Sequence, residues 1–345
     1  MSEASSIVVP KGFRASAVKA GIKPSGGLDL AILAADVPCS VAGTYTTNRV
    51  CAAPVRWCRA ITPASSVRGV VVNAGNANAA TGEQGEANVR RTAEAAAALL
   101  GCEPNQVLVA STGVIGHQLP MDRLEAGLGA AASSLSPDPE SFRTASQAIL
   151  TTDTRPKVVS EARAGYSVLG LAKGAAMIGP RMATMLAFLT TDARLRPETL
   201  QSILSEAVEE SFNCLSVEGH TSTNDTVLML ASGLASSDEL AGAELQEFAT
   251  LIRDSCRTLA QEIAADGEGS THFITLDVEG CSDREEARTL ARAVADSPLV
   301  KTAIHGADPN WGRIVSAAGY AGVPFEETEL SLWINGVCVY EKGTP

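Results

Sequence analysis

The sequence predicts a mixed α and β fold, because strand-like and helix-like segments alternate along its 345 residues. Hydrophobic residues make up 45% of the chain, which is enough for one large domain or two smaller ones, each with its own core. The sequence has no obvious repeat or low-complexity tract. We therefore expect a globular protein of this mixed class.

Strands are predicted where short runs of β-branched and aliphatic residues occur. In chain order these runs are Asp29–Ala34, Val41–Thr46, Val67–Asn73, Gln106–Ser111, Thr184–Thr190, Val227–Ser232 and Phe273–Glu279. Longer segments between them predict helices, and the clearest are Glu83–Leu100, Met121–Ser134, Pro197–Asn213, Glu239–Ala265 and Arg284–Ala295. In the fourth helix, apolar residues recur mostly at three- and four-residue steps, which indicates one buried face.

Two short segments predict breaks in this pattern. Ser136–Pro139 indicates a linker or turn, and Gly280–Asp283 indicates a boundary before a smaller final unit. We therefore expect a main domain over residues 1–279 and a smaller C-terminal unit over residues 280–345.

Composition restricts the class of function. The net charge of -12 disfavours a nucleic-acid partner, and an aromatic content of 4% argues against platforms for base stacking. The eight cysteines are scattered without a CxxC pair, a pattern typical of a reducing cytoplasm. No segment approaches the roughly 18 apolar residues that a membrane span needs. We expect a cytoplasmic enzyme that acts on small molecules.

A loop punctuated by glycine and proline runs from Leu171 to Ala183 and leads directly into the strand that Thr184 opens. The junction of a tight loop with a rigid strand can hold roughly 1–3 kcal/mol of strain on one peptide bond. On propensity alone, however, a threonine that opens a strand is ordinary, because β-branched residues favour strands. The loop by itself therefore makes Thr184 only a plausible reactive residue.

This segment, KGAAMIGPRMATMLAFLTTDA, resembles the self-processing segment of the bifunctional ornithine acetyltransferase/N-acetylglutamate synthase family. Further motifs carry the same resemblance in order and spacing: VNAGNANA at 72–79, ASTGVIG at 110–116, ILTTDTRPK at 149–157, TSTND at 221–225, DGEG at 266–269 and DPNWGR at 308–313. Together they cover nearly the whole chain.

The resemblance implies an αββα sandwich with a smaller C-terminal α/β unit. It also implies that the chain cuts itself between Ala183 and Thr184, giving an α chain of residues 1–183 and a β chain that begins at Thr184, assembled as α2β2. The freed Thr184 would be the nucleophile, and its own α-amine would take the hydroxyl proton. The implied reaction is ping-pong transfer of acetyl from N-acetylornithine to glutamate. The sequence leaves open whether acetyl-CoA is a second donor.

The oxyanion-stabilising pair that the resemblance implies is Thr112 and Gly113. A hydroxyl beside an unhindered backbone N–H suits a developing tetrahedral oxyanion. The alternative interpretation is a turn that ends a strand.

The resemblance also implies three substrate-binding residues. Lys173 would meet a substrate carboxylate as a point charge, Thr151 would contact substrate, and Glu268, between two glycines, would bind ammonium groups. Each has a plainer interpretation: a surface lysine, a helix stop that uses side-chain hydrogen bonds, and an acidic loop tip.

We predict no metal site, because the histidines are dispersed: His117, His220, His272 and His305. We also predict no bound cofactor. His220 departs from the family pattern, in which an acidic residue is expected. Family members also continue for several dozen residues beyond Pro345, including an asparagine and a serine or threonine that bind substrate. We therefore expect a shortened C-terminal unit.

Two alternatives stay open at this level. One is an N-terminal-nucleophile aminopeptidase or amidase of similar fold, in which water rather than glutamate resolves the acyl-enzyme. The other is an inactive homologue that serves as an assembly subunit, which would remain one uncut chain of 35.6 kDa.

Overall fold

The computed structural model describes residues 7–176, 179 and 185–345, and these residues form two compact units. The first unit comprises Met1–Leu215 and His220–Glu268, and the second comprises Ser216–Gly219 and Gly269–Pro345. The main part of the second unit thus begins directly after the turn that follows helix α6 (Gly242–Ala265), whereas the sequence suggests a boundary at Gly280.

The first unit is built on one mixed sheet with the strand order β4-β3-β2-β8-β7-β6-β5, and β1 pairs with β2 outside this path. Its strands are β1 (Phe13–Val18), β2 (Leu30–Tyr45), β3 (Ala64–Asn76), β4 (Val107–Val114), β5 (Lys157–Arg163), β6 (Tyr166–Lys173), β7 (Leu186–Thr191) and β8 (Thr226–Ala231). The pairs β3–β4 and β7–β8 are parallel, and the other pairs are antiparallel.

Strand β2 belongs to both halves of this sheet. Its first part, residues 30–35, pairs with β1 and β3, and its last part, residues 40–45, pairs with β8. The register with β3 shifts between Ala34 and Cys39, around Pro38, which has no backbone N–H for a ladder. The two strands predicted at Asp29–Ala34 and Val41–Thr46 are therefore one irregular strand.

The two halves of the sheet face each other across a shared core. Because side chains alternate between the faces of a strand, Leu33 and Val70 of one half lie in the same buried cluster as Leu171, Phe188 and Leu228 of the other. Helix α4 (Pro139–Ala148) adds apolar side chains to this cluster.

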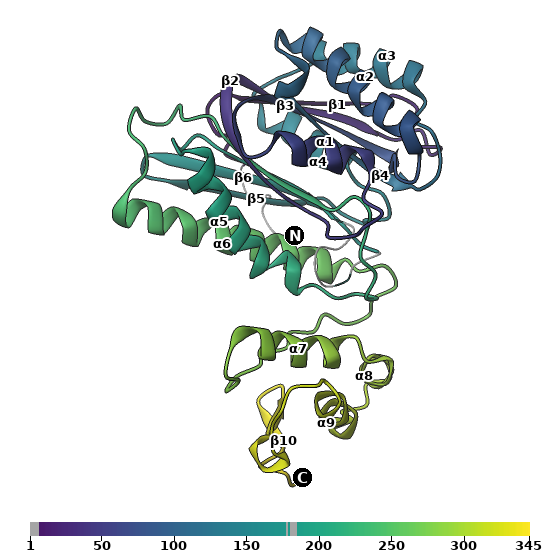
Figure 1. Cartoon of the computed structure of the whole chain (residues 1–345), viewed down its shortest axis with the longest axis vertical. Coiled ribbons are helices and arrows are strands. Elements are labelled where there is room, and N and C mark those ends of the chain that lie inside the picture. Colours follow the sequence, from purple (N-terminus) through teal and green to yellow (C-terminus); the bar gives the residue numbers. More distant parts are fainter. Residues whose placement is uncertain (1–6, 177–178, 180–184) are drawn as a thin grey trace. The chain divides into compact units, whose positions relative to one another are not determined.

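Helices cover the outer faces of the sheet. Ile32 and Val109 point outward into a second cluster with Val89 of α2 (Gly82–Leu100) and Leu124 of α3 (Met121–Ser133). Helices α5 (Pro197–Glu209) and α6 cover the other half (Figure 1). The layers are therefore helix, sheet, sheet and helix, and the predicted αββα sandwich is confirmed.

Several elements of the first unit differ from the prediction. Pro139 begins helix α4 rather than ending a linker, and the predicted pattern missed β1, β5, β6 and helix α1 (Ala53–Ile61). Helix α1 covers the edge of β4, where Trp57 Nε1 donates to the Val107 carbonyl at 2.9 Å. None of the helices in the described residues combines the length and apolarity that a membrane span requires.

The second unit contains three helices and a two-stranded hairpin. The elements are α7 (Arg284–Ala295), α8 (Pro298–His305), α9 (Trp311–Gly319), β9 (Leu332–Ile334) and β10 (Val337–Tyr340). Its core includes Val294, Val300, Ala317 and Ala318. The strand predicted at Phe273–Glu279 does not form: Phe273 is 49% exposed, and the segment pairs with no strand among the described residues. Apolar alternation favours a strand only where a partner completes the ladder.

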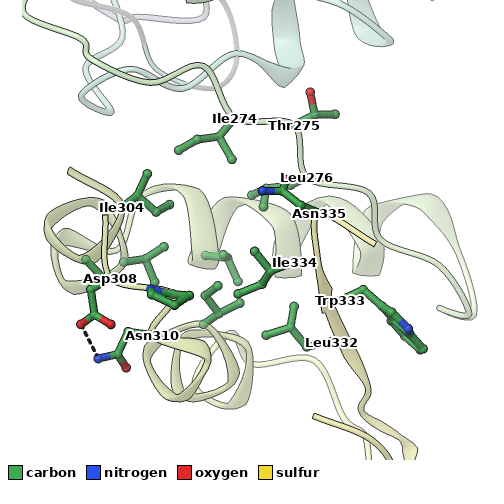
Figure 2. A pocket seen from close by; sticks show the side chains of 15 residues that line it. Ile274, Thr275, Leu276, Ile304, Asp308, Asn310, Leu332, Trp333, Ile334 and Asn335 are labelled. Carbon is green, nitrogen blue, oxygen red and sulfur yellow. Dashed lines mark hydrogen bonds between the residues drawn. The ribbon is translucent and has the colours of Figure 1, made fainter. Parts of the chain in front are cut away.

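A small cavity of about 180 Å³ lies within this second unit (Figure 2). Its walls are mainly apolar, and they include Ile274, Leu276, Ile304 and Ile334. Asn310 lies at its polar side and donates to Asp308 Oδ2 at 3.0 Å. Of the residues predicted for catalysis and substrate binding, those that the structure describes belong to the first unit, so this cavity is formed by a different set of residues.

Candidate active site

Strand β4 ends near the two residues predicted to stabilise an oxyanion. Thr112 is buried, at 2% exposure. Gly113 has φ +132°, and a Cβ added there would lie 2.3 Å from the carbonyl carbon of Gly75 in β3. Only glycine fits this conformation and this close approach. The close packing of β3 against β4 thus explains why residue 113 is glycine. As a result, the Thr112 hydroxyl is followed by a backbone N–H that no side chain hinders.

An asparagine-rich turn follows β3 and shapes the same region. Asn73 Nδ2 donates to the Asn76 carbonyl at 2.8 Å, and the Asn78 N–H donates to Asn76 Oδ1 at 2.8 Å. Asn78 has φ +46°, a left-handed conformation that asparagine tolerates better than most residues. Asn224 donates to the carbonyls of Ala77 and Ser111 at 2.6 and 2.9 Å, so this turn is tied to the segment before β8.

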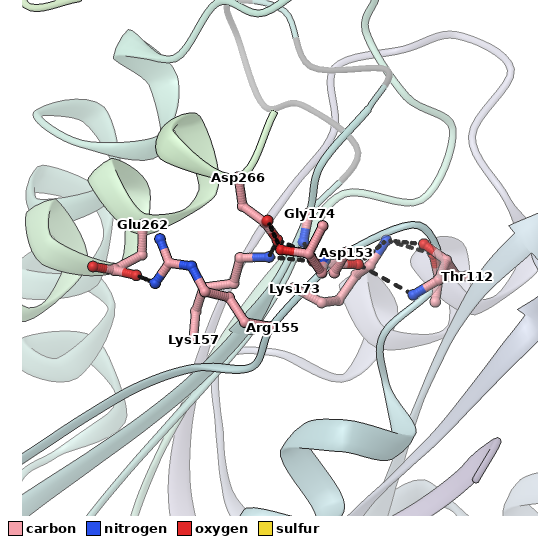
Figure 3. A network of polar contacts seen from close by, with 10 residues as sticks. Thr112, Asp153, Arg155, Lys157, Lys173, Gly174, Glu262 and Asp266 are labelled. Atoms are coloured by element: carbon pink, nitrogen blue, oxygen red, sulfur yellow. Dashed lines mark hydrogen bonds and ion pairs between the residues drawn. The ribbon is translucent and has the colours of Figure 1, made fainter. Parts of the chain in front are cut away.

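Lys173 brings two other predicted residues together. It is the last residue of β6 and is 1% exposed. Its Nζ donates to Thr151 Oγ1 at 2.8 Å and to Thr112 Oγ1 at 3.3 Å (Figure 3). Lys173 is therefore not a solvated surface lysine but a buried ammonium group beside two hydroxyls.

Asp153 and Lys157 extend this contact into a buried network. Asp153 Oδ2 lies 3.8 Å from Lys173 Nζ, and Asp153 Oδ1 accepts from Lys157 Nζ at 2.6 Å. Lys157 also pairs with Asp266, whose carboxylate accepts from the backbone and the hydroxyl of Thr154. Figure 3 shows this chain of charges, which alternates in sign from Lys173 to Asp266.

Glu268 lies close to the same network along the backbone. Its N–H donates to the carbonyl of Ala175 at 2.7 Å, and Ala175 follows Lys173 by two residues. Glu268 is exposed, and it lies two positions after the buried Asp266. The backbone thus connects the acidic turn after α6 to the segment that follows β6.

The predicted cleavage residues, Ala183 and Thr184, lie outside the described residues. The structure does describe Met185, whose N–H donates to Asp225 Oδ1 at 3.1 Å, and Leu186, which pairs with Lys173. Asp225 is fully buried, and its Oδ2 has no hydrogen-bond partner among the residues that the structure describes.

Burial sets the direction of the pKa shift of two of these groups, Lys173 and Asp225. Burial lowers the pKa of Lys173, and the nearby carboxylates of Asp153 and then Asp225 oppose this by raising it. Burial raises the pKa of Asp225 to about 8, against the opposing effects of the Met185 amide, Ser222 and Lys173. Asp225 thus favours its neutral form near neutral pH, because a buried carboxylate loses its hydration.

The described part of the chain contains no cluster of three or more histidine, cysteine, aspartate or glutamate side chains that could hold a metal ion. His272 and His305 each lie within hydrogen-bonding distance of the Thr271 hydroxyl in the second unit. Trp311 stacks on Tyr340 at 5.3 Å, and Arg313 donates to the Leu299 carbonyl. These two residues therefore contribute to packing of the second unit.

The arrangement around Lys173 is suited to binding an anion. An ammonium group has three donors, and here two of them are directed at hydroxyl oxygens that can themselves donate. Such a group of donors can hold a carboxylate or stabilise a developing oxyanion.

Sequence reasoning missed Asp153, Lys157, Asp266 and Asp225 as members of the site. All four lie in motifs that resemble the family, but only neighbouring residues were singled out there. Asp153 and Lys157 have opposite charges four residues apart, a signal that could have been noticed. The pairing of Lys157 with Asp266 joins residues that are distant in sequence, so no local pattern indicates it.

Comparison with known proteins supports the resemblance. A model of the ArgJ family matches residues 14–345. A protein of Rhodopirellula baltica named arginine biosynthesis bifunctional protein ArgJ is 46% identical over 345 residues, which span 98% of this chain and 84% of that protein. A Thermus thermophilus protein of the same name is 46% identical over 334 residues, covering 96% of this chain and 85% of that protein.

Among solved structures, the chain is similar to ornithine acetyltransferase complexed with ornithine from Mycobacterium tuberculosis. The sequence identity is 41% and the TM-score is 0.49, and the match covers 51% of this chain and 96% of that chain.

Proposed function

Because the chain belongs to the ArgJ family, we propose that it is an acyltransferase of arginine biosynthesis that moves acetyl from N-acetylornithine to glutamate. One structural observation links this proposal to a particular site: Thr112 and Thr151, which are far apart in sequence, both contact the buried ammonium group of Lys173. Lys173 also pairs with Leu186, two residues after the proposed nucleophile Thr184.

In the proposed maturation step, the Thr184 hydroxyl attacks the carbonyl carbon of Ala183. The C–N bond breaks, the amine of Thr184 takes a proton, and Ala183 is left as an ester on the threonine oxygen. Water then opens the ester and releases residues 1–183. The contact between the Met185 amide and buried Asp225 supports this step, because it fixes the backbone directly after the bond to be cut.

In the proposed catalytic cycle, the α-amine of Thr184 takes the proton from its own hydroxyl, which attacks the acetyl carbonyl of N-acetylornithine. The Thr112 hydroxyl and the Gly113 N–H would stabilise the oxyanion. Ornithine leaves as its amine is protonated, and the acetyl group stays on Thr184. The amine of glutamate then attacks this ester, so that acetylglutamate forms and Thr184 is regenerated.

The substrate contacts follow from charge. Lys173 would bind the substrate carboxylate with the help of Thr151, and Glu268 would bind an ammonium group. A cationic and an anionic side chain suit amino-acid substrates, which carry both an ammonium group and a carboxylate at neutral pH.

Two measurements test the proposal. Intact mass should give two pieces of 183 and 162 residues (345 − 183), and the purified protein should transfer acetyl from N-acetylornithine to labelled glutamate. One uncut chain would instead support an inactive assembly subunit, and release of acetate without transfer would support an aminopeptidase or amidase. Acetyl-CoA offered with glutamate tests whether it is a second donor.

We also propose that the processed chains assemble as α2β2 in the cytoplasm. Native mass spectrometry tests the assembly, and cell fractionation tests the location.

A further inference from the structure

We propose that Asp153 is a positioning residue, whose carboxylate keeps buried Lys173 cationic and directed at Thr112 and Thr151, and that Lys157 and Asp266 hold Asp153 in place. This inference rests on the proposed function in one respect, namely that Lys173 binds the substrate carboxylate.

Lys173 is deeply buried. Its side chain is 2% exposed, so its ammonium group has lost nearly all contact with water. A buried amine without a nearby negative charge gives up its proton, and a neutral amine would not attract a carboxylate. A substrate site based on Lys173 therefore needs a counter-ion.

Asp153 meets this need without using the donors of Lys173. The distance between Asp153 Oδ2 and Lys173 Nζ is 3.8 Å, longer than the 2.7–2.9 Å or so of a charge-assisted hydrogen bond. The short contact of Nζ is instead with Thr151 Oγ1, at 2.8 Å. The carboxylate therefore supplies charge, while the donors remain directed toward hydroxyls and any anion that lies beside them.

Asp153 is itself tightly fixed. Its side chain is 0% exposed, and Oδ1 accepts from the Gly174 N–H and from Lys157 Nζ, each at 2.6 Å. Oδ2 accepts from the Thr151 N–H at 3.1 Å. The Asp153 carboxylate thus contacts both Gly174, which follows Lys173, and Thr151, which accepts from Lys173. It therefore sets the distance between these two segments.

Lys157 connects this carboxylate to the turn that carries Glu268. Its side chain is 0% exposed, and it pairs with both Asp153 and Asp266. Asp266 precedes Glu268 by two residues, and the Glu268 N–H is bonded to Ala175. The network therefore ties the backbone turn that carries Glu268 to the segment that carries Lys173.

The charged groups that act on Lys173 come from several elements. Asp153 precedes β5, Lys157 is in β5, Asp225 precedes β8, and Lys23 lies between β1 and β2. Burial and the two lysines lower the pKa of Lys173, and Asp153 is first among the groups that raise it. Removing the charge of Asp153 should therefore lower this pKa further.

The test uses the full chain with lysine labelled by ¹³C at Cε, and the Lys173 signal is assigned from its loss in Lys173→Arg. In Asp153→Asn, the pH midpoint of this signal should fall by about one unit or more. Asp266→Asn is the matched control, because it removes a carboxylate from the same network that does not face Lys173. Its midpoint should stay at the original value, and an unchanged midpoint in Asp153→Asn overturns the proposal.

The second readout is the KM for N-acetylornithine across pH. In Asp153→Asn it should rise about tenfold at pH values where the variant has lost the Lys173 proton and the original protein has not. Any rise in KM caused by Asp266→Asn should be a constant factor that does not change with pH. A shifted midpoint with an unshifted KM profile would overturn the role of Asp153 in substrate binding.

The two readouts separate failure of this inference from failure of the proposed function. Absence of acetyl transfer by the original protein would reject the function, while the lysine titration would still decide whether Asp153 sets the charge of Lys173. Asp153→Glu keeps the charge and should keep the midpoint. If Asp153→Asn does not fold, the double variant Asp153→Asn/Lys157→Met is used in its place. The double variant removes one charge of each sign.

Discussion

Replacing Asp225 by asparagine should stabilise the first unit progressively as pH rises from 5 to 7. Asp225 is fully buried, its Oδ1 accepts from the Met185 amide, and burial raises its pKa from 3.8 to about 8. Asparagine has nearly the same shape and can also accept from Met185, but it does not ionise. The substitution therefore isolates the cost of keeping this carboxyl buried.

The magnitude follows from proton linkage. Between pH 5 and 7 the folded Asp225 keeps its proton, whereas the unfolded residue has released it, so the folded state binds one more proton. The free energy of unfolding of the original protein then falls by about 1.4 kcal/mol per pH unit through this residue. Relative to the original protein, the free energy of unfolding of Asp225→Asn should increase by about 3 kcal/mol between pH 5 and pH 7. This difference should level off above pH 8.

The assay is urea unfolding followed by hydrogen exchange of peptides from β8, which reports on the first unit alone. Both proteins carry Thr184→Ala, so that each is a single uncut chain. Asp266→Asn is the control: Lys157 and Thr154 lower the pKa of Asp266 despite its burial, so its contribution is constant above about pH 5 and is lost only in acid. Parallel stability curves for Asp225→Asn and the original protein would refute the reasoning.

Four further outcomes are expected. Thr184→Ala should remain one chain of 35.6 kDa and transfer no acetyl, so two bands on a denaturing gel would reject Thr184 as the cleaving residue. Lys173→Met should lower kcat/KM for N-acetylornithine about a hundredfold, because a hydrogen bond to a charged group is worth roughly 3 kcal/mol at most; a change under threefold would exclude Lys173 from the substrate site. Gly113→Ala should cost at least about 1–3 kcal/mol of stability, because φ +132° and the Gly75 backbone both oppose a side chain, and equal melting temperatures would contradict this. Activity should rise from pH 6.5 to 8.5 as the Thr184 α-amine, with a usual pKa of about 7.7–8.0, loses its proton, and a flat profile would count against amine-assisted attack.

Periodic segments could be predicted well from the sequence. Helix α7 has the predicted bounds Arg284–Ala295, and Asp283 caps it by accepting from the Glu286 N–H at 2.9 Å. Strand β6 was missed, because Tyr166–Lys173 is buried on both faces and shows no alternation. The segment 273–279 was wrongly predicted as a strand, since its apolar pattern says nothing about whether a partner strand is available.

The candidate site, like the fold, was predicted from the sequence only in part. Thr112, Thr151 and Lys173 were identified through resemblance, and the structure brings them together. Propensity alone favoured plainer interpretations, because a lysine in a loop is usually solvated. The burial of Lys173 depends on Asp153, Lys157 and Asp266, which are brought together by the packing of β5, β6 and the end of α6. Such packing depends on the whole fold and leaves no local signal.

The order of strands in the sheet determines what self-cleavage would do to the molecule. Strands β7 and β8 follow residue 184, yet β7 pairs with β6 and β8 pairs with β2, both of which precede it. A cut before Thr184 would therefore leave two strands of one fragment enclosed on both sides by strands of the other. The fragments would purify together under native conditions and separate only when the sheet is unfolded. We therefore expect any such cleavage to follow folding, and the two fragments, once separated, would not easily reassemble.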